Sequence, residues 1–304
     1  MAISRTQLVK ELEPGLNALF GLEYKRYENQ HAEIYVTESS DRAFEEEVML
    51  SGFANAQVKA EGSGVSFDTA QETYSARYTH DTVALAFAIT EEAIEDNLYD
   101  RISSRYTKAL ARSMSNAKQV KAVTPLIDGL PSTDSFDSGD GVSLFNTAHT
   151  TVSGTNVKNT LTTQADLNET SLEQSLIDIA AMTDERGLRI AARGVKMIVP
   201  SANQFTAERL MKSQGRTGTA DNDINAIGSM GMIPQGYRVN NYLTDSDAFY
   251  IITDVPNGMK MFQRAPLKTA MEGDFDTGNV RYKARERYSF GVSDPRGIYG
   301  VEGA

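Results

Sequence analysis

The sequence predicts a mixed α+β protein, and three observations lead to that class. Residues 74–79, 83–89 and 280–288 alternate with a period of two, which is typical of strands with one buried face. Residues 91–122 instead repeat their apolar side chains every four positions, as an amphipathic helix does. Strand runs and helix runs follow one another without the regular alternation of a parallel βαβ protein, which favours α+β.

The composition indicates a globular chain and excludes several kinds of site. Of the 304 residues, 40% are hydrophobic and 23% charged, which is typical of a soluble folded protein and not of a disordered one. The chain has no cysteine, so disulfides, thiolate metal sites and a cysteine nucleophile are excluded. Its three histidines lie far apart in sequence, and we expect neither a metal site nor a cofactor. The net charge of −11 argues against general electrostatic binding to nucleic acid.

No membrane or export signal is evident. The longest apolar run, residues 83–89, is far shorter than the roughly 20 residues that span a bilayer. Residues 1–15 carry both bases and acids and have no apolar centre, so they do not resemble a secretory signal peptide. We therefore expect a soluble cytoplasmic chain with no membrane partner.

The first 89 residues predict an arm followed by a long hairpin. Apolar spacing indicates a short helix within residues 4–22, interrupted at Pro14 and Gly15, and residues 1–44 are assigned to an arm. Residues 48–89 have the pattern of β structure, and the Gly62-Ser63-Gly64 sequence is suited to the tip of a hairpin. A weakly hydrophobic two-stranded ribbon is marginal in water by itself, so we expect something else to cover it.

The strongest helix prediction covers residues 91–122. Thr90 is a good N-cap, acids fill the first turns and only bases follow, which complements the helix dipole; Pro125 is expected to stop the helix. The predicted apolar stripe consists of Ile94, Leu98, Ile102, Tyr106, Leu110 and Met114.

After this helix the pattern is more varied. Residues 131–165 are rich in polar residues and glycine and predict an irregular excursion around the apolar pair Leu144-Phe145. A helix is expected at about 168–183, a buried strand at 194–200 and a further helix capped by Ser201. Residues 249–252 and 258–262 are further strand candidates.

The strand at 280–288 divides apolar from basic side chains. Val280, Tyr282, Ala284 and Tyr288 share one face. The other face carries four bases, Arg281, Lys283, Arg285 and Arg287. Bases so placed in an acidic protein are expected to pair with carboxylates, within the chain or on a partner. Contact with nucleic acid is the less favoured interpretation because the whole chain is acidic.

Motifs that carry chemistry are missing from the sequence. It contains no P-loop, dinucleotide-binding fingerprint, nucleophile elbow or zinc-protease motif. His149 has no marked nucleophile or orienting carboxylate in its pattern, which favours a structural histidine held by hydrogen bonds in a turn. We expect no catalytic residues and no enzyme activity.

Several segments together resemble one known family. They are residues 88–99 (AITEEAIEDNLY), 144–149 (LFNTAH), 195–200 (VKMIVP) and 287–297 (RYSFGVSDPRG). In order and spacing they resemble the major capsid proteins of tailed bacteriophages, most closely the Mu-like major head subunits. The resemblance implies the tailed-phage major capsid fold, with an N-terminal arm, an extended β-hairpin loop, a peripheral domain with a long spine helix, and an axial domain.

The resemblance also implies a domain order. It runs as an arm (1–44), an extended loop (45–89), a peripheral domain (90–174) that contains the spine helix 91–122 and the excursion 131–165, an axial domain (175–265) and a return to the peripheral domain (266–304).

The function implied is that of a shell subunit. Copies would assemble into hexamers and pentamers of an icosahedral head enclosing double-stranded DNA bound without sequence specificity. Portal and scaffold or decoration proteins are implied as further partners, and the location as the virion capsid after assembly in the host bacterial cytoplasm. An encapsulin-like nanocompartment shell is the alternative, and a hydrolase with an unrecognised site a distant one.

One contact between subunits can be predicted from charge. The acidic residues Glu45, Glu46 and Glu47 are the leading candidates to receive Arg281, Lys283, Arg285 or Arg287 of an adjacent subunit.

Overall fold

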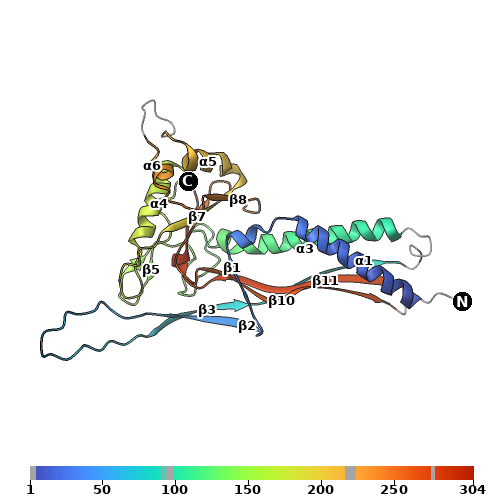
Figure 1. Ribbon diagram of the computed structural model, residues 1–304, viewed down its shortest axis with the longest axis horizontal. Coiled ribbons are helices and arrows are strands. Elements are labelled where there is room, and N and C mark those ends of the chain that lie inside the picture. The colour runs from blue at the N-terminus through green and yellow to red at the C-terminus, as the bar shows by residue number, and fades with distance from the viewer. Residues whose placement is uncertain (1–4, 91, 93–98, 216–223, 275–277) are drawn as a thin grey trace.

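A computed structural model describes residues 5–90, 92, 99–215, 224–274 and 278–304. It has the mixed helix and sheet content that the sequence predicts, with two four-stranded sheets and two two-stranded ladders among the described residues. Figure 1 shows an elongated molecule in which a long sheet lies beside two helices, and a more rounded unit stands at one end. The two stripe positions Ile94 and Leu98 lie outside the described residues.

The long sheet has the strand order β1-β10-β11-β4. Its strands are β1 (Val36–Ser39), β10 (Met259–Gly273), β11 (Val280–Val292) and β4 (Asp81–Ile89). β1 runs parallel to β10, and the other two pairings are antiparallel. The alternation predicted for residues 280–288 is confirmed, because Tyr282, Ala284 and Tyr288 are buried.

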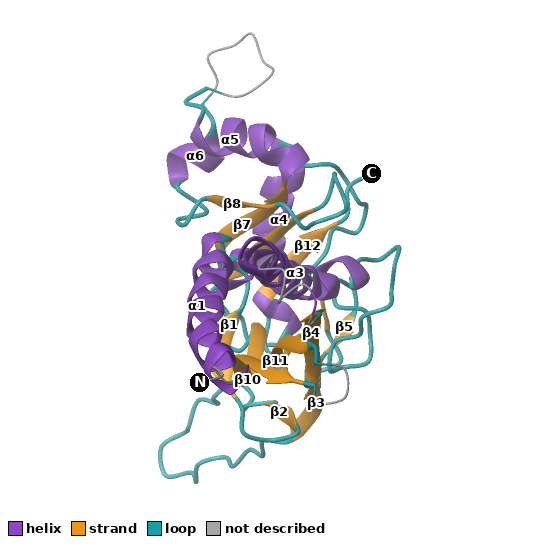
Figure 2. Ribbon diagram, turned by 90° about the vertical axis from the view of Figure 1, so that its right-hand side faces the viewer, coloured by secondary structure: helices purple, strands orange, loops and turns teal. Residues whose placement is uncertain are grey.

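Helices α1 (Arg5–Arg26) and α3 (Tyr99–Asp128) cover one face of this sheet (Figures 1 and 2). Leu16 and Phe20 of α1 pack with Leu110 and Met114 of α3 against Tyr282. Leu110 and Met114 are buried as predicted, whereas Tyr106 is mostly exposed. Each four-residue step turns about 40° beyond a full helical turn, so Tyr106 has rotated away from the seam that Met114 occupies.

Both prolines expected to interrupt helices lie inside them. α1 runs through Pro14, and α3 continues through Pro125 to Asp128 instead of ending near 122, so both predictions were wrong. A proline removes one hydrogen bond, but tertiary packing can outweigh that loss. The last turn of α3 buries Leu126 beside Ala122 in the core, which favours continued helix.

The predicted hairpin is shorter than expected. β2 (Phe44–Leu50) pairs with β3 (Glu72–Thr79), and residues 51–71 between them form a long loop without regular strands (Figure 1). Residues 81–89, predicted as part of the extended loop, instead form β4 and pair with β11. The alternating side chains of β4 find a sheet to join, whereas the loop residues are mostly polar and small.

The second sheet, of order β12-β9-β7-β8, forms the rounded unit. Its strands are β12 (Ile298–Val301), β9 (Phe249–Thr253), β7 (Gly194–Pro200) and β8 (Tyr237–Asn240). Helices α4 (Glu169–Ala181), α5 (Gln204–Lys212) and α6 (Ala226–Met230) accompany it. Because β12 pairs with β9, the last strand belongs to this sheet. The domain order implied by the resemblance, with a return of 266–304 to the peripheral domain, stays a prediction.

Short elements complete the chain. They are the 3-10 turns η1 (Gln30–Glu33), η2 (Ser201–Asn203) and η3 (Pro295–Gly297), and the ladder of β5 (His149–Thr150) with β6 (Asn156–Val157). Ser201 starts η2 and makes no capping hydrogen bond to α5, unlike the prediction. Leu144 and Phe145 are fully buried, as the prediction of an excursion built around them requires.

Candidate assembly surface

The open face of the long sheet carries the predicted bases. Tyr282 and Ala284 of β11 pack against α1 and α3, so the odd-numbered residues next to them belong to the opposite face of the sheet. The β2–β3 ribbon lies on that side (Figure 2). Arg281, Lys283 and Arg285 are exposed there, and their neighbours across β4 are the small residues Ala88, Ala86 and Ala84. The result is a shallow basic surface with little side-chain cover.

Only one of these bases is neutralised by an ion pair within the described residues. Arg281 pairs with Asp274, whereas Lys283 and Arg285 have no ion pair there. Arg285 lies opposite Lys268 of β10, and like charges directly across two strands are unfavourable unless an anion lies between them. We call Lys268, Arg281, Lys283 and Arg285 the sheet-face bases.

Arg287 belongs to a different environment. Its side chain is half-buried near Thr79, at the root of the β2–β3 ribbon, which is the end that adjoins the long sheet. Its Nε has no hydrogen-bond partner among the described residues. His80 lies close by, with its ring between the hydroxyls of Ser40 (2.9 Å) and Ser289 (3.0 Å). Burial and the Arg287 guanidinium lower the pKa of His80. Arg287 is therefore not part of the exposed basic surface that the sequence predicts.

The acids predicted as partners are held within their own chain. Glu47 Oε1 lies 2.5 Å from Lys260 Nζ, and its other oxygen accepts from Ser293. Glu45 accepts from Ser40 Oγ at 2.7 Å, and Glu46 lies 3.8 Å from Arg77. Among the described residues no ion pair joins these acids to the sheet-face bases.

Lys260 is the residue that fixes the ribbon to the sheet. Its side chain is only 8% exposed and pairs with Glu47 of the ribbon and with Glu38 of β1, the latter at 3.2 Å. Burial lowers the pKa of Lys260, but the hydrogen bonds that its ammonium donates to the two carboxylates outweigh this and raise it. Sequence reasoning missed this residue because its partners lie more than 200 positions away.

The ribbon covers one end of the open face. Tyr78 of β3 packs on Phe262 with ring centroids 4.8 Å apart. A side chain at Gly291 would meet the Tyr78 ring at 2.7 Å, so this glycine permits the contact. The part of the face that carries residues 281–285 lies beyond this contact and is left uncovered by the chain.

Beyond the root, the ribbon and its loop expose large apolar side chains. Val58 is fully exposed and Phe67 is 94% exposed. Their exposed companions are Phe44, Val48, Leu50, Phe53 and Val65. Apolar side chains gathered on one extended segment mark an interaction surface more often than chance exposure.

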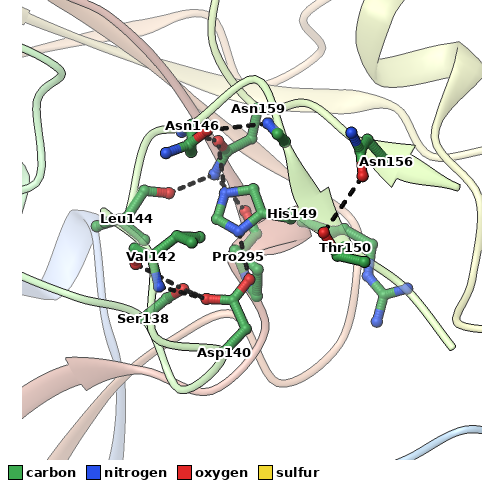
Figure 3. Close-up of polar contacts among 12 residues, drawn as sticks. Ser138, Asp140, Val142, Leu144, Asn146, His149, Thr150, Asn156, Asn159 and Pro295 are labelled. Atoms are coloured by element: carbon green, nitrogen blue, oxygen red, sulfur yellow. Dashed lines mark hydrogen bonds and ion pairs between the residues drawn. The ribbon is translucent and has the colours of Figure 1, made fainter. Parts of the chain in front are cut away.

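His149 is held in a buried polar cluster (Figure 3). Its Nδ1 lies 2.6 Å from Asp140 Oδ2 and its Nε2 lies 3.1 Å from Asn159 Oδ1. The Asn159 amide is oriented by its own bonds, because its Nδ2 donates to the carbonyls of Leu144 (2.7 Å) and Pro295 (3.0 Å). Burial raises the pKa of Asp140, but the bonds from His149 and Ser138 outweigh it and lower it.

This cluster connects segments and offers no reacting group. Both ring nitrogens face acceptor oxygens, so neither is directed at a hydroxyl that the histidine could activate. The bonds of Asn159 join the 144–149 turn to η3. His149 is structural, as predicted, while the roles of Asp140 and Asn159 had no signal in the sequence.

Metal-binding clusters and membrane-spanning helices can be assessed in the part of the chain that the structure describes. Within it, no group of three or more histidine, aspartate or glutamate side chains is arranged to hold a metal ion. No helix in the same residues combines the length and apolarity that crossing a membrane requires.

The fold is that of capsid subunits in several solved structures. The capsid protein of an empty GTA particle aligns with a TM-score of 0.57 at 15% identity, over 90% of this chain and 89% of that one. The procapsid protein of bacteriophage JBD30 aligns with a TM-score of 0.55 at 13% identity, over 99% and 77%. The virus-like particle of Pyrococcus furiosus aligns with a TM-score of 0.54 at 8% identity, over 94% and 98%.

The sequence also matches a known protein family. The phage capsid protein family matches residues 73–301, which is most of the chain, and the chain belongs to that family. No curated protein sequence matches it. The chain is a structural major capsid protein and not an enzyme, and its place is the virion capsid.

Proposed function

We propose that copies of this chain assemble as hexamers and pentamers into an icosahedral head that encloses double-stranded DNA. Assembly would take place in the host bacterial cytoplasm, with portal and scaffold or decoration proteins as further partners. Membership of the phage capsid protein family supports a shell role. The observation that carries the proposal is the apolar ribbon and loop, which the chain itself does not cover.

The energetics favour coverage by another copy. Burying one large apolar side chain contributes about 1.5–3 kcal/mol, so two residues as exposed as Val58 and Phe67 can supply several kcal/mol to an interface. Val58 and Phe67 are left almost entirely uncovered by the residues that the structure describes. A repeating contact between identical subunits would use this energy at every position of a shell.

The sheet-face bases supply a second contact in the proposal. We infer that an acidic side chain of an adjacent subunit lies between Arg285 and Lys268, where two like charges otherwise oppose each other. Of the three acids predicted as partners, Glu46 is best placed to contribute, because it is exposed and its bond to Arg77 is long. Glu47 is already committed to Lys260.

Electron microscopy of the purified full chain tests the proposal. Closed shells of uniform size, built from rings of six and five subunits, are the expected result. A folded monomer that stays monomeric at high concentration, with or without added scaffold protein, would contradict it. Shells that enclose a protein cargo and never DNA in the producing cell would favour the nanocompartment alternative.

A further inference from the structure

We propose that the outer side of α3 contacts the phosphates of the packaged duplex through Arg105, Lys108 and Arg112, which would place this side of the subunit toward the interior of the shell. This inference rests on the proposed function, since it needs a shell filled with DNA. The three side chains lie at positions i, i+3 and i+7, which places them on one face of the helix within about 10 Å along its axis. We call them the helix-face bases.

The bases of α3 divide into two groups by what they contact. Lys118 faces the sheet and pairs with buried Glu286 at 3.3 Å, and Lys121 pairs with Asp81 at 2.5 Å. The helix-face bases are all exposed, and the structure pairs none of them with an acid among the residues it describes. From 101 to 127 the chain contains no acid at all. Positive charge is therefore concentrated on the outer side of the helix.

One of the three is held in place without being neutralised. The Nε of Arg112 donates to Tyr27 Oη at 2.8 Å, and its guanidinium lies 5.8 Å from the centre of that ring. The phenol fixes the direction of the side chain while its charge stays available. A charged group oriented before binding loses less conformational freedom when it meets an anion.

The surroundings of the helix-face bases suit phosphate better than a protein partner. The exposed side chains next to them are the small residues Ala109 and Ser113 and one larger residue, Tyr106. Protein interfaces need a core of several large apolar anchors, and this strip offers only the one tyrosine. Duplex DNA presents one negative charge per roughly 1.7 Å of axis, so a bare row of cations meets phosphates in any register.

The contact should be weak and independent of sequence. Three phosphate contacts give a slope of log K against log salt of about −2.7, far below that of a dedicated DNA-binding protein. The remainder of the chain is acidic and repels the duplex. A lining of this kind would hold the outermost layer of DNA without preventing its movement during filling.

Binding of a fluorescent 20-base-pair duplex to unassembled full-length chain at about 50 mM salt tests the inference. The variant R105Q/K108Q/R112Q should lose at least tenfold in affinity, and its salt slope should be smaller in magnitude by about 2.7. The matched control K268Q/K283Q/R285Q removes three charges from the sheet face and should lose less than about threefold in affinity. Equal loss in both variants, or loss in neither, would overturn the assignment.

Two further arms keep the result interpretable. A 20-residue polyglutamate tested under the same conditions should bind at least tenfold more weakly than the duplex; equal binding would mean that the strip receives an acidic protein and not DNA. The single variants R105Q and K108Q, checked for an unchanged thermal melt, should each give part of the loss, so that misfolding of the triple variant cannot explain it. Microscopy of the same preparations reports shell formation separately, so a failure to assemble is distinguishable from a failure to bind DNA.

Discussion

The two four-stranded sheets differ in how far the chain itself covers them. In the β12-β9-β7-β8 sheet Met197, Val199 and Ile251 are fully buried beneath neighbouring elements of the same chain. The β1-β10-β11-β4 sheet has helices α1 and α3 on one face. Its other face carries exposed bases and adjoins the ribbon with its exposed apolar residues (Figures 1 and 2). The first sheet is completed by folding, whereas the second leaves one face for the partner subunit that we propose.

The largest expected difference between the two sheets comes from one substitution made in both. A side chain at Gly300 of β12 would meet carbon atoms of the Phe145 ring at 2.6 Å, whereas none of the described residues lies within 4 Å of one at Gly273 of β10. Gly300→Val should cost about 3 kcal/mol or more, because the close-packed core cannot move aside. Gly273→Val should cost less than about 0.5 kcal/mol. Urea unfolding of both variants checks this, and equal losses would remove the distinction.

The root of the ribbon should be the next most sensitive place. Glu47→Gln removes one of the two carboxylates that hold the buried ammonium of Lys260 and should cost about 2 kcal/mol. The matched change Glu46→Gln removes an exposed contact and should cost less than about 0.5 kcal/mol. Thermal or urea unfolding measures both. If the two variants proved equally stable, Lys260 would not be what fixes the ribbon.

The helix-covered side of the molecule should respond to acid through His31. Burial and the nearby Lys118 ammonium lower its pKa from 6.5 to about 4. The Gln119 amide accepts from the His31 backbone N–H at 2.9 Å and so turns its Nε2 toward His31 Nδ1, 3.0 Å away, which suits the neutral ring.

The sign of the effect follows from which state binds the proton. Between pH 6.5 and 4 the unfolded chain protonates this ring and the folded chain does not, so stability falls as the pH is lowered. The loss from this group should reach about 2 kcal/mol at pH 5 relative to pH 8. Unfolding of the unmodified chain and of His31→Gln at both pH values measures it. An identical pH dependence in the variant would show that other groups cause it.

The smallest expected effect concerns the sheet-face bases. Lys283→Glu with Arg285→Glu should leave the stability of the subunit unchanged and raise the concentration needed for assembly several-fold at low salt, since exposed pairs are worth about 0.2–1 kcal/mol each. The difference should shrink at about 1 M salt, where screening is short-ranged. Light scattering during assembly follows it. Unchanged assembly at every salt concentration would end the proposal for this contact.

The sequence could predict what is encoded locally. The period of two at residues 280–288 identified both faces of β11, and an alternating apolar pattern identified β4 as a strand. Its pairing with β11 could not be predicted, because pairing between distant strands leaves no local trace. The helix ends predicted at Pro14 and Pro125 were wrong for a related reason, because the packing that keeps each helix intact comes from residues far away in the chain.

The assembly surface could be predicted only in part. Charge alternation on β11 was visible, but Lys260, Asp140 and Asn159 act through single contacts that no spacing reveals. Glu286 is a clear case, since this buried acid lies on the otherwise apolar face of β11 and is 1% exposed. It is tolerated there because Lys118 of α3 meets it, and its pKa is raised by burial.

Hydrogen exchange of residues 51–71, compared between the unassembled subunit and the assembled particle, tests the central claim most directly. Strands β7 and β9 provide the internal standard, because they are covered in both states. We expect the loop to exchange rapidly in the subunit and to gain strong protection in the particle, while β7 and β9 stay protected throughout. A loop that is equally open in both states would show that a second copy does not cover it.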